Sequence, residues 1–117
     1  MDIRTKRIYE PLDSDEGYRV LVDRIWPKGM SKEKARIDSW LKELAPSKEL
    51  RQWFGHEPSK WEEFRERYFE EPTEHRDQLN QLAEMTQSGP LTIVYSSRET
   101  RYNNAVALKA YLESKAG

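Results

Sequence analysis

The sequence predicts one small α/β domain over residues 1–117, with a short, mainly parallel sheet of about three strands and several helices packed on it. Two apolar runs carry this prediction, Val20-Leu21-Val22 and Leu91–Tyr95. Neither run alternates between apolar and polar residues, which is typical of strands covered on both faces. A long stretch of helical character separates them, and such a connection favours a parallel pair.

The composition indicates a chain that folds around a small aromatic core. Its 20 basic and 21 acidic residues leave a net charge of −1, and 4 Trp, 6 Tyr and 3 Phe supply large side chains for burial. A disordered chain would combine a large net charge with few aromatic residues. We therefore expect a folded domain with a highly charged surface.

Several classes of protein are excluded by residues that the sequence lacks. Without cysteine there is no disulfide, thiolate metal site, iron–sulfur cluster or cysteine nucleophile. There is no apolar run long enough to span a membrane, and the N-terminal residues do not resemble a signal peptide. We expect a soluble, cytoplasmic protein with no membrane partner.

The elements follow one another as strand, strand, several helices, strand and helix. We expect strands over residues 3–9, 18–26 and 91–95, with Pro27-Lys28-Gly29 ending the second. A turn over residues 96–104 leads to the last helix, whose larger apolar side chains are Val106, Leu108 and Leu112.

The middle of the chain reads as helices with recognisable ends. Ser31 is a candidate N-cap for a helix to about residue 45, because Ile37, Trp40, Leu41 and Leu44 have helical spacing. A short helix follows between Ser47 and Gly55, which is placed to terminate it. Ser59 and Glu62 resemble a capping box, Pro72 breaks the next helix, and another ends near Ser88.

Polar residues cluster where the two buried strands end. Ligands of open parallel sheets bind beyond the carboxyl ends of the strands. The second strand leads into Asp23, Arg24, Trp26 and Lys28. The strand over residues 91–95 leads into Ser96, Ser97 and Arg98, and then into Asn103 and Asn104. Arginine forks, hydroxyls, amides and a helix N-terminus together suit a phosphate or carboxylate.

A structural interpretation of the same residues stays open. Asp23 beside Arg24 is also expected as part of a structural ion pair, and Asn103 or Asn104 as a helix N-cap. No glycine-rich phosphate loop is present. Trp26 is the tryptophan that we expect to be partly exposed, with Trp40, Trp53 and Trp61 in the core.

The remaining candidates for catalysis give weaker patterns. His56 follows Gly55 and suits either an acid/base group or a contact with the end of a helix. His75 lies in a polar stretch that we expect at the surface. The two histidines define no metal site, no cofactor is indicated, and Ser96 and Ser97 lack the surroundings of a hydrolase nucleophile.

A family resemblance rests on longer strings. These are Asp23-Arg24-Ile25-Trp26-Pro27-Lys28-Gly29, residues 31–35 and 40–47, Trp53-Phe54-Gly55-His56, residues 61–64 and Asn103-Asn104-Ala105. With them the chain resembles the YeaO-like proteins, short bacterial members of a domain-of-unknown-function family. The resemblance implies a small α/β cytoplasmic domain and brings no reaction or cofactor. It supports Arg24, Trp26, His56 and Asn104 as site residues more than Ser96 or Ser97.

Three functions remain in competition, and whether the chain is an enzyme is undecided. The first is binding of a small anionic ligand at the strand ends, with Asp23 or His56 available for acid/base chemistry. The second is a protein-interaction module that uses exposed tryptophans or the acidic stretch 61–84, which otherwise is a solvated helix face. The third, nucleic-acid binding, is disfavoured because no broad basic face is evident.

Overall fold

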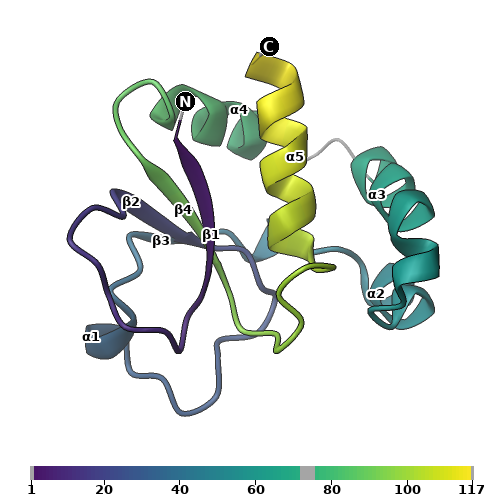
Figure 1. The fold of residues 1–117 in the computed structure, drawn as a ribbon, viewed down its shortest axis with the longest axis horizontal. Helices are drawn as coiled ribbons and strands as arrows, with labels where there is room; N and C mark the ends of the chain where they lie inside the picture. The colour runs from purple at the N-terminus through teal and green to yellow at the C-terminus, as the bar shows by residue number, and fades with distance from the viewer. Residues whose placement is uncertain (1, 72–75, 117) are drawn as a thin grey trace.

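Four parallel strands form the sheet of this protein, in the order β1-β4-β2-β3. The computed structural model describes residues 2–71 and 76–116. Strand β1 spans Ile3–Arg7, β2 spans Tyr18–Leu21, β3 spans Ser39–Trp40 and β4 spans Leu91–Tyr95. The predicted α/β class and parallel pairing are confirmed, with one strand more than expected (Figure 1).

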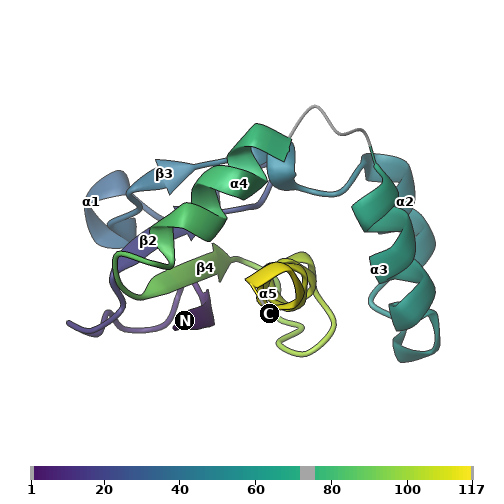
Figure 2. The same cartoon turned by 90° about the horizontal axis from the view of Figure 1, so that it is seen from above.

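Most of the helical structure follows β3 in the chain. The α-helices are α1 (Lys32–Ala35), α2 (Lys48–Phe54), α3 (Trp61–Glu70), α4 (Arg76–Met85) and α5 (Asn104–Ala116), and two 3₁₀ turns are η1 (Lys42–Leu44) and η2 (Pro58–Lys60). Helix α5 packs on β1 and β4, while α2 and α3 pack on each other beside the sheet (Figures 1 and 2). None of the helices in the described ranges is both long and apolar enough to cross a membrane.

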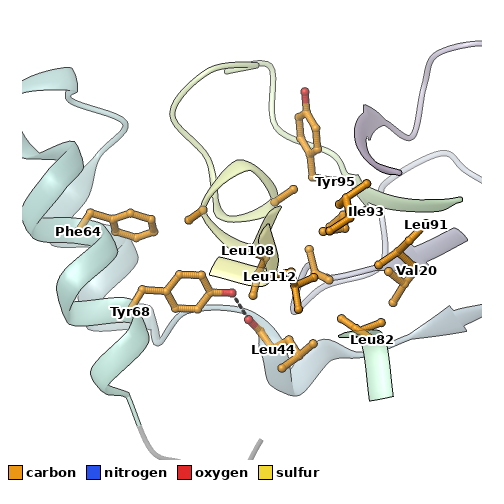
Figure 3. Packing of buried hydrophobic residues seen from close by; sticks show 14 of the residues in the cluster. Val20, Leu44, Phe64, Tyr68, Leu82, Leu91, Ile93, Tyr95, Leu108 and Leu112 are labelled. Carbon is orange, nitrogen blue, oxygen red and sulfur yellow. Dashed lines mark hydrogen bonds between the residues drawn. The ribbon is translucent and has the colours of Figure 1, made fainter. Parts of the chain in front are cut away.

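The larger core lies between the sheet and the helices. Val20, Leu91 and Ile93 from the sheet pack with Leu108 and Leu112 of α5 (Figure 3). On α3, the buried hydroxyl of Tyr68 donates to the carbonyl of Leu44, and burial raises the pKa of Tyr68. This bond joins α3 to η1 and so helps to position the α2–α3 pair.

A second cluster covers the other face of the sheet. Leu21 and Val94, which are paired in register, point to this face and pack with Ile8 and Ala35. The predicted burial of both strand faces is therefore confirmed. Charged groups share this face, because Glu16 and Arg19 are buried there beside Lys6.

The predicted helix from Ser31 to residue 45 is wrong. Ser31 does cap a helix, since its hydroxyl accepts from the Lys34 N–H at 3.2 Å. That helix ends at Ala35, because Arg36 adopts a left-handed conformation with φ 47°. The chain then extends, and Ser39 and Trp40 pair with β2. Sheet pairing thus replaces the helix that the apolar spacing predicted.

Three smaller expectations about element ends also need correction. The first two strands are shorter than predicted and end at Arg7 and Leu21. The capping box at Ser59 is absent among the described contacts, because Pro58 begins a 3₁₀ turn and α3 starts only at Trp61 without a side-chain cap. Pro72 and His75 lie outside the described residues.

Candidate functional site

One open cleft, with a volume of about 720 Å³, lies at the carboxyl edge of the sheet. Strands β2 and β4 are parallel neighbours, so the segments that follow them leave the sheet at the same edge. The cleft is lined on its other side by residues of α2 and α3. All ten residues singled out in the sequence line it, namely Asp23, Arg24, Trp26, Lys28, His56, Ser96, Ser97, Arg98, Asn103 and Asn104.

Asp23 connects the ends of the two central strands. Its Oδ2 accepts from the backbone N–H of Ser96 at 2.8 Å and from the Ser96 hydroxyl at 2.7 Å. Its Oδ1 lies 3.5 Å from the side-chain amide of Asn104. Among the described residues it forms no ion pair with Arg24, so the ion-pair interpretation of this position is wrong. Asp23 instead positions Ser96 and Asn104.

The two asparagines hold the start of α5 against the sheet. Asn103 is buried, and its side-chain oxygen accepts from the Val106 N–H at 2.9 Å, which makes it the N-cap that the sequence left open. Asn104 donates to the carbonyl of Val22 at 3.0 Å. The Ser97 hydroxyl accepts from the Glu99 N–H at 3.0 Å. These polar groups shape the cleft edge and place the N-terminal end of α5 beside it.

Basic side chains dominate the charge of the cleft. Five basic residues and one acidic residue line it, which gives a local formal charge of 5 − 1 = +4 with His56 neutral; the basic ones are Arg7, Arg24, Lys28, Arg51 and Arg98. Within the described chain, none of these five pairs with a carboxylate. Lys28, Arg51 and Arg98 have no side-chain hydrogen bond there either. Their charges are therefore free to meet a ligand.

Two of the arginines touch backbone carbonyls that orient them. Arg7 Nε donates to the Ser97 carbonyl at 2.8 Å and lies 3.3 Å from that of Ser96. Arg24 Nη2 lies 3.5 Å from the carbonyl of Pro46. A carbonyl contributes no net charge, so both guanidinium groups keep an unneutralised positive charge at the cleft.

His56 joins the end of α2 to the turn before α5. It follows the left-handed cap Gly55 and is itself left-handed, with φ 57°. Its Nδ1 lies 2.9 Å from the carbonyl of Tyr102, and because a carbonyl only accepts, Nδ1 carries the proton in this bond. The nearby carboxyl of Glu99 has its pKa lowered, chiefly by the Arg101 N–H. Asp23 and His56 share no contact.

Aromatic and aliphatic side chains form the rest of the lining. Trp26 donates its indole N–H to the Met30 carbonyl at 2.6 Å, and its ring packs edge-on to Trp40 at 5.4 Å. Trp26 is half-buried, but Trp40 is exposed, so the expectation that Trp40 is a core residue is wrong. Ile25, which the sequence pattern does not single out, is 70% exposed at the cleft.

Three polar residues of the cleft were missed in the sequence. Arg7 and Tyr9 come from the end of β1, and the strand-end rule would have found them if it had been applied to that strand. Arg51 lies on α2, and no sequence signal places that helix opposite the strand ends. Among the described residues, no group of three or more acidic or histidine side chains could hold a metal ion.

The fold and the cleft together define a small parallel α/β domain with a basic cleft at the carboxyl edge of its sheet. The family model DUF488-N3i, described as "Inactive DUF488-N3 subclade", matches residues 2–116, and the chain belongs to this family. The resemblance to the YeaO-like proteins is thereby confirmed.

Relatives of similar length are known by sequence. The chain is 41% identical to the uncharacterized protein YeaO of Escherichia coli K12 over 114 residues, covering 97% of this chain and 99% of that protein. It is also 41% identical over 113 residues to uncharacterized proteins of Mycobacterium bovis and Mycobacterium tuberculosis, covering 97% of this chain and 95% of each. No solved structure matches the chain significantly.

Proposed function

We propose that this protein binds a small anionic ligand, bearing phosphate or carboxylate, in the cleft at the carboxyl edge of the sheet. The observation that carries the proposal is the excess of basic side chains there without carboxylate partners. Guanidinium groups recognise such anions through paired hydrogen bonds, and the N-terminal end of α5 adds backbone dipoles of the same sign.

The contacts of the two acid/base candidates, Asp23 and His56, fit a protein that binds a ligand without converting it. The carboxylate of Asp23 already accepts two hydrogen bonds from Ser96 on one oxygen, and the Nδ1 proton of His56 is engaged by a carbonyl. Neither group is adjacent to the other, so no acid/base pair is formed. The word "inactive" in the description of the matched family agrees with a binding role.

The other candidate partners fit the cleft less well. Nucleic acid requires an extended basic surface, whereas the outer side of the adjoining α3 carries exposed Glu62, Glu63 and Glu66. A protein partner is favoured by the exposed Ile25 at the rim and by the exposed Trp40. A cytoplasmic location stays a prediction.

The test is calorimetric titration of the protein with phosphate, pyrophosphate and citrate at low ionic strength. Arg98→Gln should weaken binding of the best of these at least about tenfold, as expected for a lost charge-assisted hydrogen bond. Arg101→Gln is the matched control, because Arg101 is exposed in the same turn but does not line the cleft. No binding by folded protein, or equal losses in both variants, would overturn the proposal.

A further inference from the structure

The cleft has two chemically different parts. Its cations come mostly from the strand ends, whereas exposed apolar surface is contributed by Tyr9, Ile25 and the half-buried Trp26. Tyr9 and Ile25 are 42% and 70% exposed. An inorganic anion would use only the cations, and so would leave this apolar surface in water.

The aromatic groups at the cleft are held in place by contacts with neighbouring residues. The hydroxyl of Tyr9 donates to the Lys28 carbonyl at 2.8 Å, and the guanidinium of Arg7 lies 4.9 Å from the Tyr9 ring centre. Trp26 is fixed by its bond to Met30 and by its packing on Trp40. Ordered rings lose little conformational entropy when a planar group packs on them.

The charge of the cleft favours phosphate over carboxylate. The local formal charge is 5 − 1 = +4, and a carboxylate supplies one negative charge. A phosphate monoester supplies roughly −1.5 to −2 in one compact group with three acceptor oxygens. That group offers more acceptors to the guanidinium groups that line the cleft than a single carboxylate does.

The size of the cleft indicates a ligand larger than phosphate itself. Its volume of about 720 Å³ lies in the range of sites that hold organic molecules of cofactor size. The cleft also extends from the strand ends to Phe54 and Phe64, whose rings stack at 4.2 Å and belong to α2 and α3. A ligand that fills it has an organic body as well as an anionic group.

From these observations we infer that the ligand is a phosphate ester carrying a planar aromatic ring, of which a nucleoside monophosphate is the simplest case. The inference rests on the proposed anion site and adds a second contact to it. The phosphate meets Arg24, Lys28 and Arg98, and the ring packs against Ile25 and Trp26. Stacking of a base on a protein ring strengthens binding by roughly tenfold or more.

The experiment compares adenosine 5′-monophosphate, ribose 5-phosphate and inorganic phosphate by calorimetry at one ionic strength. We expect the nucleotide to bind at least about tenfold more tightly than ribose 5-phosphate. Trp26→Leu and Ile25→Ala should each reduce nucleotide affinity and leave ribose 5-phosphate affinity unchanged. Leu12→Ala is the control, because Leu12 is also an exposed aliphatic residue but does not line the cleft.

The outcomes separate this inference from the proposed function. Equal affinity for the nucleotide and ribose 5-phosphate would overturn the aromatic contact while the anion site stands. Binding of none of the three compounds would overturn both. Because Trp26→Leu removes a hydrogen bond and packing, Ile25→Ala provides the decisive variant if Trp26→Leu does not fold.

Discussion

Two groups of charged side chains in this protein differ in whether their charges are paired. On the second face of the sheet, the carboxylate of Glu16 binds Lys6 Nζ at 2.5 Å and also pairs with Arg19. In the cleft, Arg51 and Arg98 have no carboxylate partner among the described residues. Charged residues therefore have two roles here. The paired group stabilises the fold, and the unpaired group is available to a ligand.

Burial explains this difference. The side chains of Glu16 and Arg19 are almost fully buried, and a buried charge is tolerated only when it is paired and hydrogen-bonded. Burial by itself would raise the pKa of Glu16, but hydrogen bonds from Lys6, the Asp13 N–H and Arg19 outweigh it and lower that pKa. The cleft cations remain in water, where an unpaired charge costs little.

Removal of the Glu16 charge should have the largest effect on stability. Glu16→Gln leaves the buried Arg19 without its anion and Lys6 with only the exposed Asp13, and we expect the free energy of unfolding to fall by about 3–5 kcal/mol. Urea unfolding followed by circular dichroism measures the change. Asp15→Asn is the control, since Asp15 pairs with Arg4 at the surface, and its effect should stay below about 1 kcal/mol. Similar losses in both variants would contradict the explanation that burial makes the pairing of Glu16 important for stability.

Asp23→Asn should have an intermediate effect. Asp23 lines the cleft, but it is a structural group, because its carboxylate holds the N–H and the hydroxyl of Ser96. We expect a loss of about 1.5–3 kcal/mol in the free energy of unfolding, the usual range for hydrogen bonds to a charged group. Ser96→Ala, which removes only the hydroxyl, should cost less. An Asp23→Asn variant as stable as the parent would contradict this positioning role.

The pairing of Glu16 with Lys6 and Arg19 also makes the stability of the protein depend on pH. The pKa of Glu16 is lower in the folded protein than its ordinary value of 4.5, so its contribution is complete above that value and is lost as the pH falls through the folded pKa. The slope for one such group is at most about 1.4 kcal/mol per pH unit. In urea unfolding at a series of pH values, the free energy of unfolding should therefore fall less steeply toward acid pH for Glu16→Gln than for the parent. The same pH dependence in both proteins would contradict this role of Glu16.

Removal of two cleft cations should have the smallest effect on stability. In the double variant Lys28→Gln with Arg51→Gln, no ion pair of the described residues is broken, and we expect the free energy of unfolding to change by less than about 0.5 kcal/mol. Its affinity for phosphate should fall in the same sample. A stability loss of more than about 1.5 kcal/mol would show that these charges belong to the fold.

The sequence predicted the central strands and failed where tertiary contacts decide the conformation. The apolar runs at Val20–Val22 and Leu91–Tyr95 are covered on both faces, as a short continuous apolar run bounded by turns predicts. Ile37, Trp40 and Leu44 have helical spacing, yet Trp40 pairs with β2 and Leu44 joins the core on the helical face. Local spacing could not reveal a partner strand that lies nineteen positions earlier in register.

The candidate site was predictable as far as it depends on strand order. Ser96–Arg98 and Asp23–Lys28 follow neighbouring parallel strands, so the strand-end rule brings them together. Arg51 was not predictable, because its place in the cleft depends on how α2 packs beside α3. The sequence offered Asn103 or Asn104 as the N-cap, and hydrogen-bond geometry was needed to choose Asn103 and to show that Asp23 is a structural acceptor.

Amide chemical-shift mapping of isotopically labelled protein during a phosphate titration tests most directly whether the unpaired cations form a ligand site. We expect saturable shifts at Arg24, Lys28, Arg98 and Asn104, and none around Lys6, Glu16 and Arg19. Folded protein that shows no saturable shift along the cleft, or equal shifts at both charged groups, would contradict it.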